Sequence, residues 1–304
     1  MSAVADPSGL LSNAVMKAAP LEHLWTIAEW AEGPVWVPSS RRARFSDAIN
    51  NRILQFDPAT GTGTVYDDAA EYTNGRTLDL DGQVVQCSHG RRGIERDVDG
   101  TVTTIVDRWL PDGRTEFVRF NSPNDIVVKS DGSIWFTDPP YGILPGTKEG
   151  REAPQEYDGC YLFRFGPADD EPDGDWVAVP VVTELIHPNG LAFSPDESIL
   201  YIADTGTKRN SMYALENGEL RLFKELEQGA SDGFRVDVEG RIWTSAGDHV
   251  IVLAPDGSEL LDVPFPERVS NLCFGGPDGT DVYVTASSSL YRLRTTTRDA
   301  AQHY

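Results

Sequence analysis

Residues 122–138 read SPNDIVVKSDGSIWFTD, and variants of this phrase recur along the chain. The phrase combines a polar residue, alternating apolar residues, an Asp-Gly turn and a second strand rich in aromatic and β-branched residues. This is the pattern of a β-hairpin. The clearest further copies are YTNGRTLDLDGQVVQCS (72–88), HPNGLAFSPDESILYIAD (187–204) and ASDGFRVDVEGRIWTSA (230–246), and two looser ones are AEGPVWVPSSRRARFSD (31–47) and VSNLCFGGPDGTDVYVTA (269–286).

A further pair of short strands follows the hairpins, as in NRILQFDPATGTGTVY (51–66) and SMYALENGELRLFKE (211–225). Four strands in about 40–50 residues is the period of a propeller blade. Six copies therefore predict an all-β fold, a six-bladed β-propeller over residues 24–293. The chain of 304 residues could accommodate two domains, but one radial core shared by all blades favours a single domain. We expect residues 1–23 to form an N-terminal arm and residues 294–304 a flexible C-terminal tail.

The composition disfavours several classes of binding partner. The net charge is −22 and the pI is about 4.5, which disfavours binding to nucleic acid or to anionic membranes. Neither a signal peptide nor a membrane-spanning apolar run is evident. The three cysteines are far apart and odd in number, so no disulfide framework is indicated and a cytoplasmic location is expected. The sequence does not indicate an oligomeric state.

One polar residue opens each of the six repeats. The inner strands of a propeller start at one face beside the central channel, so these side chains should form a ring there. The ring would consist of Glu32, Asn74, Asn124, Asn189, Asp232 and Asn271. Asn-Gly and Asp-Gly are also common turn dipeptides, but six in phase favour a central metal. Oxygen ligands suit Ca²⁺, with Mg²⁺, Mn²⁺ or Zn²⁺ as alternatives.

The ends of the second strands should lie around the same face. The long connection 139–159 is expected there as well, either as a lid or as a surface insertion. Tyr141 and Arg151 on this connection are candidate substrate contacts. His89 is expected at the rim as a contact to a substrate hydroxyl, with a catalytic role less favoured.

Two motifs are discounted. Residues 229–233, GASDG, match the nucleophile motif G-x-S-x-G, but the segment that follows reads as a hairpin and not as the required helix. Residues 169–175, DDEPDGD, lack the pattern of an EF-hand loop and fit a solvated acidic turn.

Several ordered motifs together resemble the gluconolactonase/senescence marker protein (regucalcin) family, in particular its bacterial gluconolactonase-like branch. They are EGPVW (32–36), FNSPNDIVVKSDGSIWFTDPPYG (120–142), HPNGLAFSPD (187–196) and SDGFRVD (231–237). The resemblance implies a six-bladed propeller with one divalent metal in the channel and hydrolysis of sugar lactones. It places the metal ligands on Glu32, Asn124, Asn189 and Asp232, and leaves Asn74 and Asn271 as contacts to substrate or water.

The expected reaction is metal-dependent hydrolysis of a small-molecule sugar lactone, such as gluconolactone, to its acid. The metal would polarise the carbonyl and Asp232 would accept a proton from the attacking water. Animal members of the family carry Arg where this chain has Ser122, so sugar recognition must differ and the lactone is not specified. The alternatives are a phosphotriesterase-like or promiscuous lactonase on the same site, and a non-catalytic calcium-binding or interaction propeller.

Overall fold

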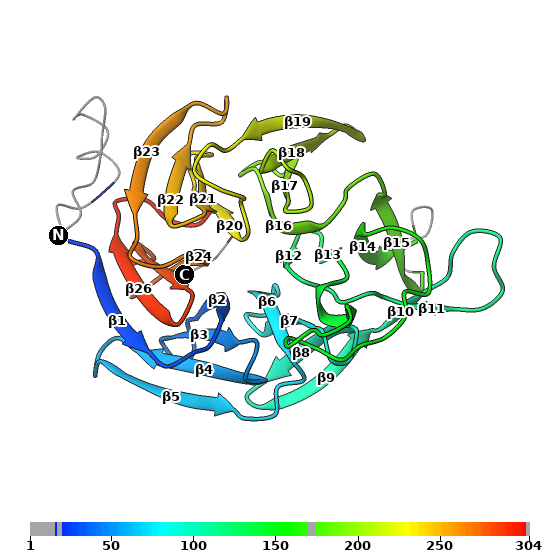
Figure 1. Ribbon diagram of the computed structural model, residues 1–304, viewed down its shortest axis with the longest axis horizontal. Helices are drawn as coiled ribbons and strands as arrows, with labels where there is room; N and C mark the ends of the chain where they lie inside the picture. The colour runs from blue at the N-terminus through cyan, green and yellow to red at the C-terminus, as the bar shows by residue number, and fades with distance from the viewer. Residues whose placement is uncertain (1–15, 17–19, 169–173, 302–304) are drawn as a thin grey trace.

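The computed structural model describes residues 16, 20–168 and 174–301. Six antiparallel four-stranded sheets are arranged around a central axis, and the innermost strands are β2, β6, β12, β16, β20 and β24 (Figure 1). The predicted six-bladed β-propeller is therefore confirmed. Within the described residues the one helix is the 3₁₀ turn η1 (Tyr141–Ile143), and no helix is long and apolar enough to cross a membrane.

The strands of the first three blades follow the repeats in order. Blade 1 contains β2 (Ala31–Val37), β3 (Arg42–Asp47), β4 (Arg52–Asp57) and β5 (Thr62–Asp67). Blade 2 contains β6 (Thr73–Leu78), β7 (Val84–Ser88), β8 (Gly93–Val98) and β9 (Thr101–Val106). A two-stranded ribbon, β10 (Arg108–Trp109) with β11 (Val118–Arg119), precedes blade 3, which contains β12 (Ile126–Val128), β13 (Ile134–Asp138), β14 (Tyr161–Pro167) and β15 (Trp176–Val182).

The second half of the chain completes the ring. Blade 4 contains β16 (Pro188–Phe193), β17 (Ile199–Asp204), β18 (Ser211–Glu216) and β19 (Glu219–Glu225). Blade 5 contains β20 (Phe234–Val236), β21 (Ile242–Ala246), β22 (His249–Leu253) and β23 (Glu259–Pro264). Blade 6 contains β24 (Val269–Gly275), β25 (Asp281–Ala286) and β26 (Ser289–Arg294), with β1 (Glu22–Thr26) as its outermost strand.

Strand β1 closes the ring, because it joins the first part of the chain to the last blade. It pairs antiparallel with β26, and Nη2 of Arg292 lies 2.6 Å from Oε2 of Glu22. The indole of Trp25 meanwhile covers Gly63 of β5, where a Cβ atom would lie 2.3 Å from the ring. Blade 1 and blade 6 are thus bound together by one strand that contacts both.

Three polar-Gly dipeptides lie inside inner strands and not at turns, and the fourth, Asp232-Gly233, directly precedes β20. The pairing register shifts at the three, for example between Pro188 and Leu191 in β16. At that position the Gly190 amide donates to the Asp232 carbonyl of the next blade at 2.9 Å, and a Cβ on Gly190 would lie 2.2 Å from that oxygen. Glycine is required because the backbones of adjacent blades meet there. The same close approach to the next blade occurs at Gly33, Gly75 and Gly233.

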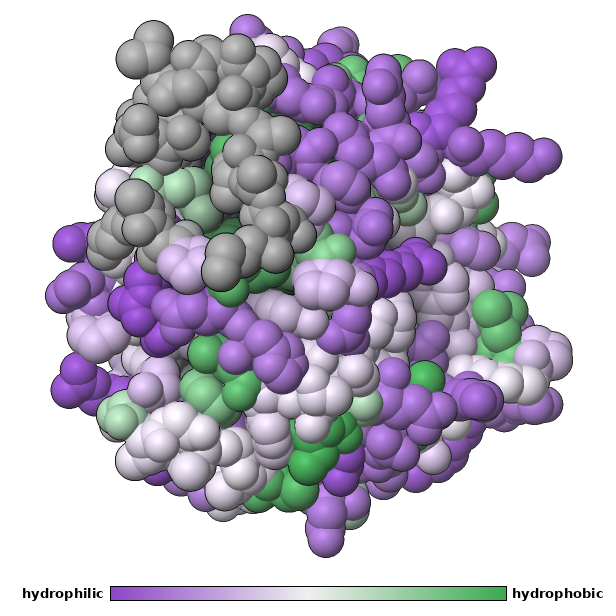
Figure 2. Space-filling view, turned by 60° about the vertical axis from the view of Figure 1, so that its left-hand side comes forward, coloured by the Kyte–Doolittle hydropathy of each residue, from purple (hydrophilic) through white to green (hydrophobic). Residues whose placement is uncertain are grey.

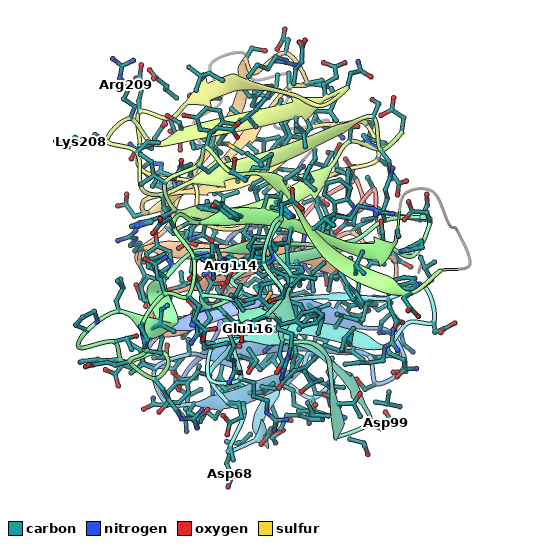
Figure 3. All side chains as sticks on the ribbon, turned by 90° about the vertical axis from the view of Figure 1, so that its right-hand side faces the viewer. Asp68, Asp99, Arg114, Glu116, Lys208 and Arg209 are labelled. Carbon is teal, nitrogen blue, oxygen red and sulfur yellow. The ribbon has the colours of Figure 1, made fainter. Side chains whose placement is uncertain are left out.

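Apolar side chains fill the space between neighbouring blades. Between blades 2 and 3, for example, the Phe120 ring lies 5.0 Å from both Phe136 and Phe163, centroid to centroid. The view in Figure 2 shows a mainly hydrophilic surface with small, separate hydrophobic groups. Charged side chains such as Asp68, Asp99 and Arg209 extend outward from the rim (Figure 3).

The segment after β26 differs from the flexible tail that we expected, as far as it is described. The Ala300 amide donates to the Val236 carbonyl at 2.9 Å, and Asp299 forms a β-bridge with Asp237. Thr295 and Asp299 are buried. Backbone pairing with blade 5 holds this segment in place, which its polar composition did not indicate. Of the expected arm, most residues lie outside the described part, as do residues 169–173 of the acidic DDEPDGD turn.

Candidate active site

A cavity of about 260 Å³ lies at the face where the inner strands begin. Five of the six predicted ring residues line it, each from a different blade: Glu32, Asn74, Asn124, Asn189 and Asp232. The sixth, Asn271, does not line the cavity. Its amide instead hydrogen-bonds the carboxylates of Glu32 and Asp125, and its Oδ1 accepts from the Leu272 amide at 2.8 Å. Asn271 therefore orients cavity residues and does not face the cavity itself.

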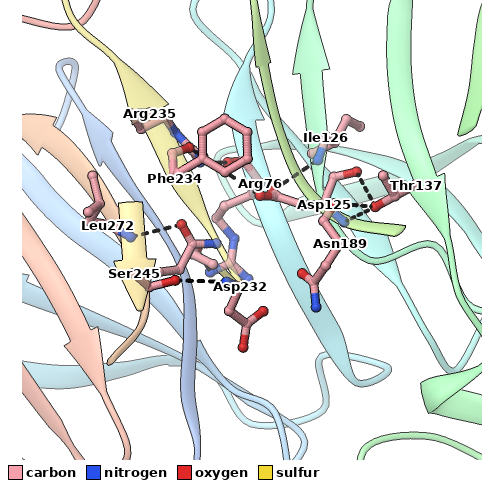
Figure 4. A network of polar contacts seen from close by, with 12 residues as sticks. Arg76, Asp125, Ile126, Thr137, Asn189, Asp232, Phe234, Arg235, Ser245 and Leu272 are labelled. Atoms are coloured by element: carbon pink, nitrogen blue, oxygen red, sulfur yellow. Dashed lines mark hydrogen bonds and ion pairs between the residues drawn. The ribbon is translucent and has the colours of Figure 1, made fainter. Parts of the chain in front are cut away.

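Neighbouring strands fix the backbone of the ring residues. The Asp232 amide donates to Oγ of Ser245 at 2.8 Å, and Oγ1 of Thr137 donates to the Asn189 carbonyl at 2.8 Å. With these backbone groups occupied, the side chains of Asp232 and Asn189 project into the same open space (Figure 4). The sheets thus preorganise the backbone of these ring residues.

The two acidic ring residues, Glu32 buried and Asp232 half-buried, are close enough for their negative charges to repel each other. Burial raises the pKa of Glu32 well above its usual range, and the charge of Asp232 raises it further. Burial likewise raises the pKa of Asp232 to about 7; Arg268 opposes this rise, whereas Glu149 and Asp125 add to it. A cation between the two carboxylates would remove this unfavourable interaction.

The chemistry of the ligand atoms fits a hard cation. Within the described residues, no three His, Cys, Asp or Glu side chains are grouped as a metal site, and neither His nor Cys lines this cavity. Glu32 and Asp232 offer carboxylate oxygens, and the three asparagines offer amide oxygens. Such oxygens suit Ca²⁺ or Mg²⁺, whereas zinc sites generally use nitrogen and sulfur ligands. The residues present therefore fit a calcium-like ion.

Beneath the ring, charged side chains fill the channel. Arg235 lies 3.7 Å from Asp125, and Nη1 of Arg76 donates to the Gly33 carbonyl at 2.9 Å. Burial lowers the pKa of Arg76 to about 9. None of these three residues was predicted from the sequence. For Arg235 the available signal was its place between two apolar residues in the inner strand FRV (234–236).

The 139–159 loop contributes two residues to the cavity. Tyr141 lines it, as predicted, and its hydroxyl lies 2.5 Å from Oγ1 of Thr205, which also lines it. Glu149 lines the cavity too and was missed, because nothing in the loop sequence gives the direction of its side chain. Burial raises the pKa of Glu149 to about 7. Arg151 was also a candidate; it does not line the cavity but pairs with Glu71.

Two more lining residues, Trp30 and Arg268, were missed. Both lie just before an inner strand and outside the repeated phrase, and the Arg268 guanidinium lies 5.9 Å from the Trp30 ring centroid. They give the cavity an aromatic wall and a cation.

The structure does not bring His89 to the cavity, in contrast to our expectation. The side chain is buried, and its Nδ1 lies 2.8 Å from the Glu149 carbonyl oxygen. Burial lowers the pKa of His89 to about 4. The histidine directly follows β7, but its ring contacts the 139–159 loop and does not line the cavity.

The aspartates that end three of the second strands also have a structural role. Asp204 accepts hydrogen bonds from the amides of Ile186 and His187 at 2.9 and 2.8 Å. Asp47 and Asp138 bind the corresponding segments before the inner strands of blades 1 and 3. These carboxylates hold the chain just upstream of the ring residues.

One family model and two curated relatives match most of the chain. A family model described as the SMP-30/Gluconolactonase/LRE-like region matches residues 30–288. A gluconolactonase of Zymomonas mobilis is 30% identical over 92% of this chain and 82% of its own length. The pentonolactonase XacC of Haloferax volcanii is 30% identical over 86% of this chain and 83% of its own.

Solved structures extend the similarity to the fold. A gluconolactonase of Xanthomonas campestris superposes with a TM-score of 0.85 at 35% identity, covering 97% of this chain and 95% of that one. A regucalcin of Agrobacterium tumefaciens, described as a calcium-binding protein, matches with a TM-score of 0.70 at 18% identity, covering 93% and 95% of the two chains. The second match bears on the fold alone.

Proposed function

The chain belongs to the SMP-30/gluconolactonase/LRE-like family, and on this premise we propose that it is a lactonase that opens a sugar lactone to its acid with the help of one divalent metal. Two curated relatives, a gluconolactonase and a pentonolactonase, are each 30% identical to it over most of both chains. Their names support lactone hydrolysis as the reaction and aldonolactones as the substrate class.

One observation of the structure carries the metal proposal. One buried and one half-buried carboxylate converge with three amides on one cavity, and these five groups come from five different blades. Glu32, Asn124, Asn189 and Asp232 would hold the ion, with Ca²⁺ the best match to their oxygens. Bound there, a divalent cation would supply electrostatic stabilisation for the negative charge that develops on a carbonyl oxygen during hydrolysis.

The residues of the chain have separate tasks in this proposal. Asp232 accepts a proton from the attacking water, since its carboxylate faces the cavity while Ser245 secures its backbone. Asn74 hydrogen-bonds the substrate or the water, and Tyr141 and Thr205 bound the cavity on the side of the 139–159 loop. Trp30 presents a ring face to the C–H surface of the substrate.

A substrate panel tests this function. Acid release at constant pH would be followed for D-glucono-1,5-lactone, a pentonolactone, an unsubstituted lactone and an aryl phosphotriester, each with added Ca²⁺. We expect turnover of the sugar lactones to exceed that of the other compounds. Preferred turnover of the phosphotriester, or Ca²⁺ binding without any turnover, would contradict the proposal.

A further inference from the structure

The Glu149 carboxylate differs from the other two acids of the cavity. Glu32 lies in the inner strand β2 and Asp232 lies just before the inner strand β20, whereas Glu149 comes from the 139–159 loop between β13 and β14. Its side chain is half-buried, and no hydrogen bond or ion pair joins its carboxylate to any residue in the described part of the chain. A carboxylate taken partly out of water without a partner is costly, which indicates that a ligand supplies the missing contacts.

The loop that carries Glu149 is fastened to blade 2. Arg151 forms an ion pair with Glu71, and its guanidinium lies 5.5 Å from the Tyr72 ring centroid. The buried ring of His89 binds the Glu149 carbonyl at 2.8 Å. These contacts, which we call the latch, fix the backbone at Glu149 and directly after it.

The chemistry of the cavity separates two tasks. The inner-strand oxygens form the ring that suits a cation, and Arg268 is the one cationic side chain among the lining residues that the structure describes. The Glu149 carboxylate lies outside that ring yet is near enough to raise the pKa of Asp232. Two carboxylate oxygens can accept hydrogen bonds from two adjacent hydroxyl groups, and such charge-assisted bonds are stronger than neutral ones.

We propose that Glu149 is the specificity-determining residue of the cavity, accepting hydrogen bonds from neighbouring ring hydroxyls of a polyhydroxylated lactone while the latch holds it in place. This inference rests on the proposed lactonase function and names the contact that selects a sugar lactone over an unsubstituted one. If the Glu149 carboxylate is removed, a substrate hydroxyl loses water on binding and gains no hydrogen-bond partner in return. The preference for a sugar lactone over an unsubstituted lactone should therefore fall.

The test compares D-glucono-1,5-lactone, whose ring carries hydroxyls, with δ-valerolactone, whose ring carries none. We expect Glu149→Ala to lower kcat/KM for gluconolactone about 10- to 100-fold and to leave the value for δ-valerolactone within about threefold of wild type. Ca²⁺ affinity, measured by calorimetry, should change by less than about threefold. Glu149→Gln keeps one acceptor oxygen and the shape of the side chain, so it should give the same pattern with a smaller loss, and it serves if Glu149→Ala fails to fold.

Two further variants sharpen the result. Glu152→Ala removes an exposed carboxylate from the same loop outside the cavity, and it should leave the ratio of the two substrates unchanged. Arg151→Met breaks the ion pair of the latch, and it should lower the preference for gluconolactone in the same direction as Glu149→Ala.

An equal loss on both lactones, or a Ca²⁺ affinity weakened tenfold or more, would overturn the inference in favour of a general catalytic or metal-binding role for Glu149. An unchanged ratio would overturn it as well, while wild-type turnover of gluconolactone would leave the proposed function standing. Absence of wild-type turnover on any lactone would overturn the proposed function and this inference together.

Discussion

At the scale of single residues, the central feature is the pair of neighbouring acids Glu32 and Asp232. If Asp232 accepts the proton of the attacking water, Asp232→Asn should lower kcat about 100- to 10,000-fold, because an amide cannot take up that proton. The fold should persist, since the substitution removes a half-buried charge and keeps the shape of the side chain. Acid release would be measured at a Ca²⁺ concentration that titration shows to saturate the variant. Turnover within tenfold of wild type would contradict the role of Asp232.

The same pair predicts how the stability of the metal-free protein depends on pH. The pKa of Asp232 rises from an ordinary value of 3.8 to about 7 in the folded state, and that of Glu32 also rises. Between pH 3.8 and about pH 7 the folded protein therefore binds more protons than the unfolded chain. Its free energy of unfolding falls as the pH increases through this range. The fall is at most about 1.4 kcal/mol per pH unit for each group.

Urea unfolding in the presence of a chelator, at intervals from pH 4 to pH 8, would measure this slope. Saturating Ca²⁺ should flatten it, because the ion stabilises the ionised carboxylates. Equal slopes with and without Ca²⁺ would indicate that these two groups do not share a cation.

At the scale of elements, the inner strands are tied together where the polar-Gly dipeptides occur. Gly190→Ala would place a methyl group 2.2 Å from the Asp232 carbonyl, so the strands β16 and β20 must separate. We expect a loss of about 1–3 kcal/mol in unfolding free energy. Ca²⁺ affinity should weaken as well, because the displaced residues flank Asn189 and Asp232.

Gly218→Ala is the matched control for this effect. Gly218 has a φ of +79°, and no atom lies within 4 Å of the position that a Cβ would take, so only backbone strain is added there. That strain costs about 1–2 kcal/mol and should leave Ca²⁺ affinity unchanged. If the two variants bind Ca²⁺ equally well, the contact between blades does not position the ring.

The repeated phrases were sufficient to predict the strands of the six blades, because equivalent positions of the repeats lie at the same height and the same distance from the propeller axis. For the same reason they predicted the cavity residues Glu32, Asn74, Asn124, Asn189 and Asp232. The prediction that Asn271 faces the cavity was wrong. Asn271 occupies the equivalent position in blade 6, but its side chain hydrogen-bonds Glu32 and Asp125. The repeats also could not indicate Glu149, Arg268 and Trp30, since loops outside the repeats carry no periodicity that fixes where their side chains point.

At the scale of the whole molecule, ring closure depends on β1, whose partner β26 lies far away in sequence. Sequence periodicity describes neighbours along the chain, which is why the closing strand was not singled out beforehand. Trp25→Ala removes an indole that packs on β5 and lies 6.2 Å from the Phe45 ring. We expect the free energy of unfolding to fall by about 2–3 kcal/mol.

Trp176→Ala is a suitable comparison for Trp25→Ala. Trp176 lies on β15 and is 44% exposed, so its removal should cost about 1 kcal/mol or less. Chemical denaturation of both variants would measure the difference. Equal losses would show that β1 contributes no more to the ring than an ordinary edge residue does.

The Ca²⁺ dependence of gluconolactone hydrolysis decides whether the inner-strand oxygens hold a catalytic cation. The rate would be measured as Ca²⁺ is returned to chelator-treated protein. We predict negligible turnover after chelation and a rate that rises with Ca²⁺ until one ion is bound per chain. Turnover that continues undiminished without any divalent metal would contradict the assignment of the inner-strand oxygens to a catalytic cation.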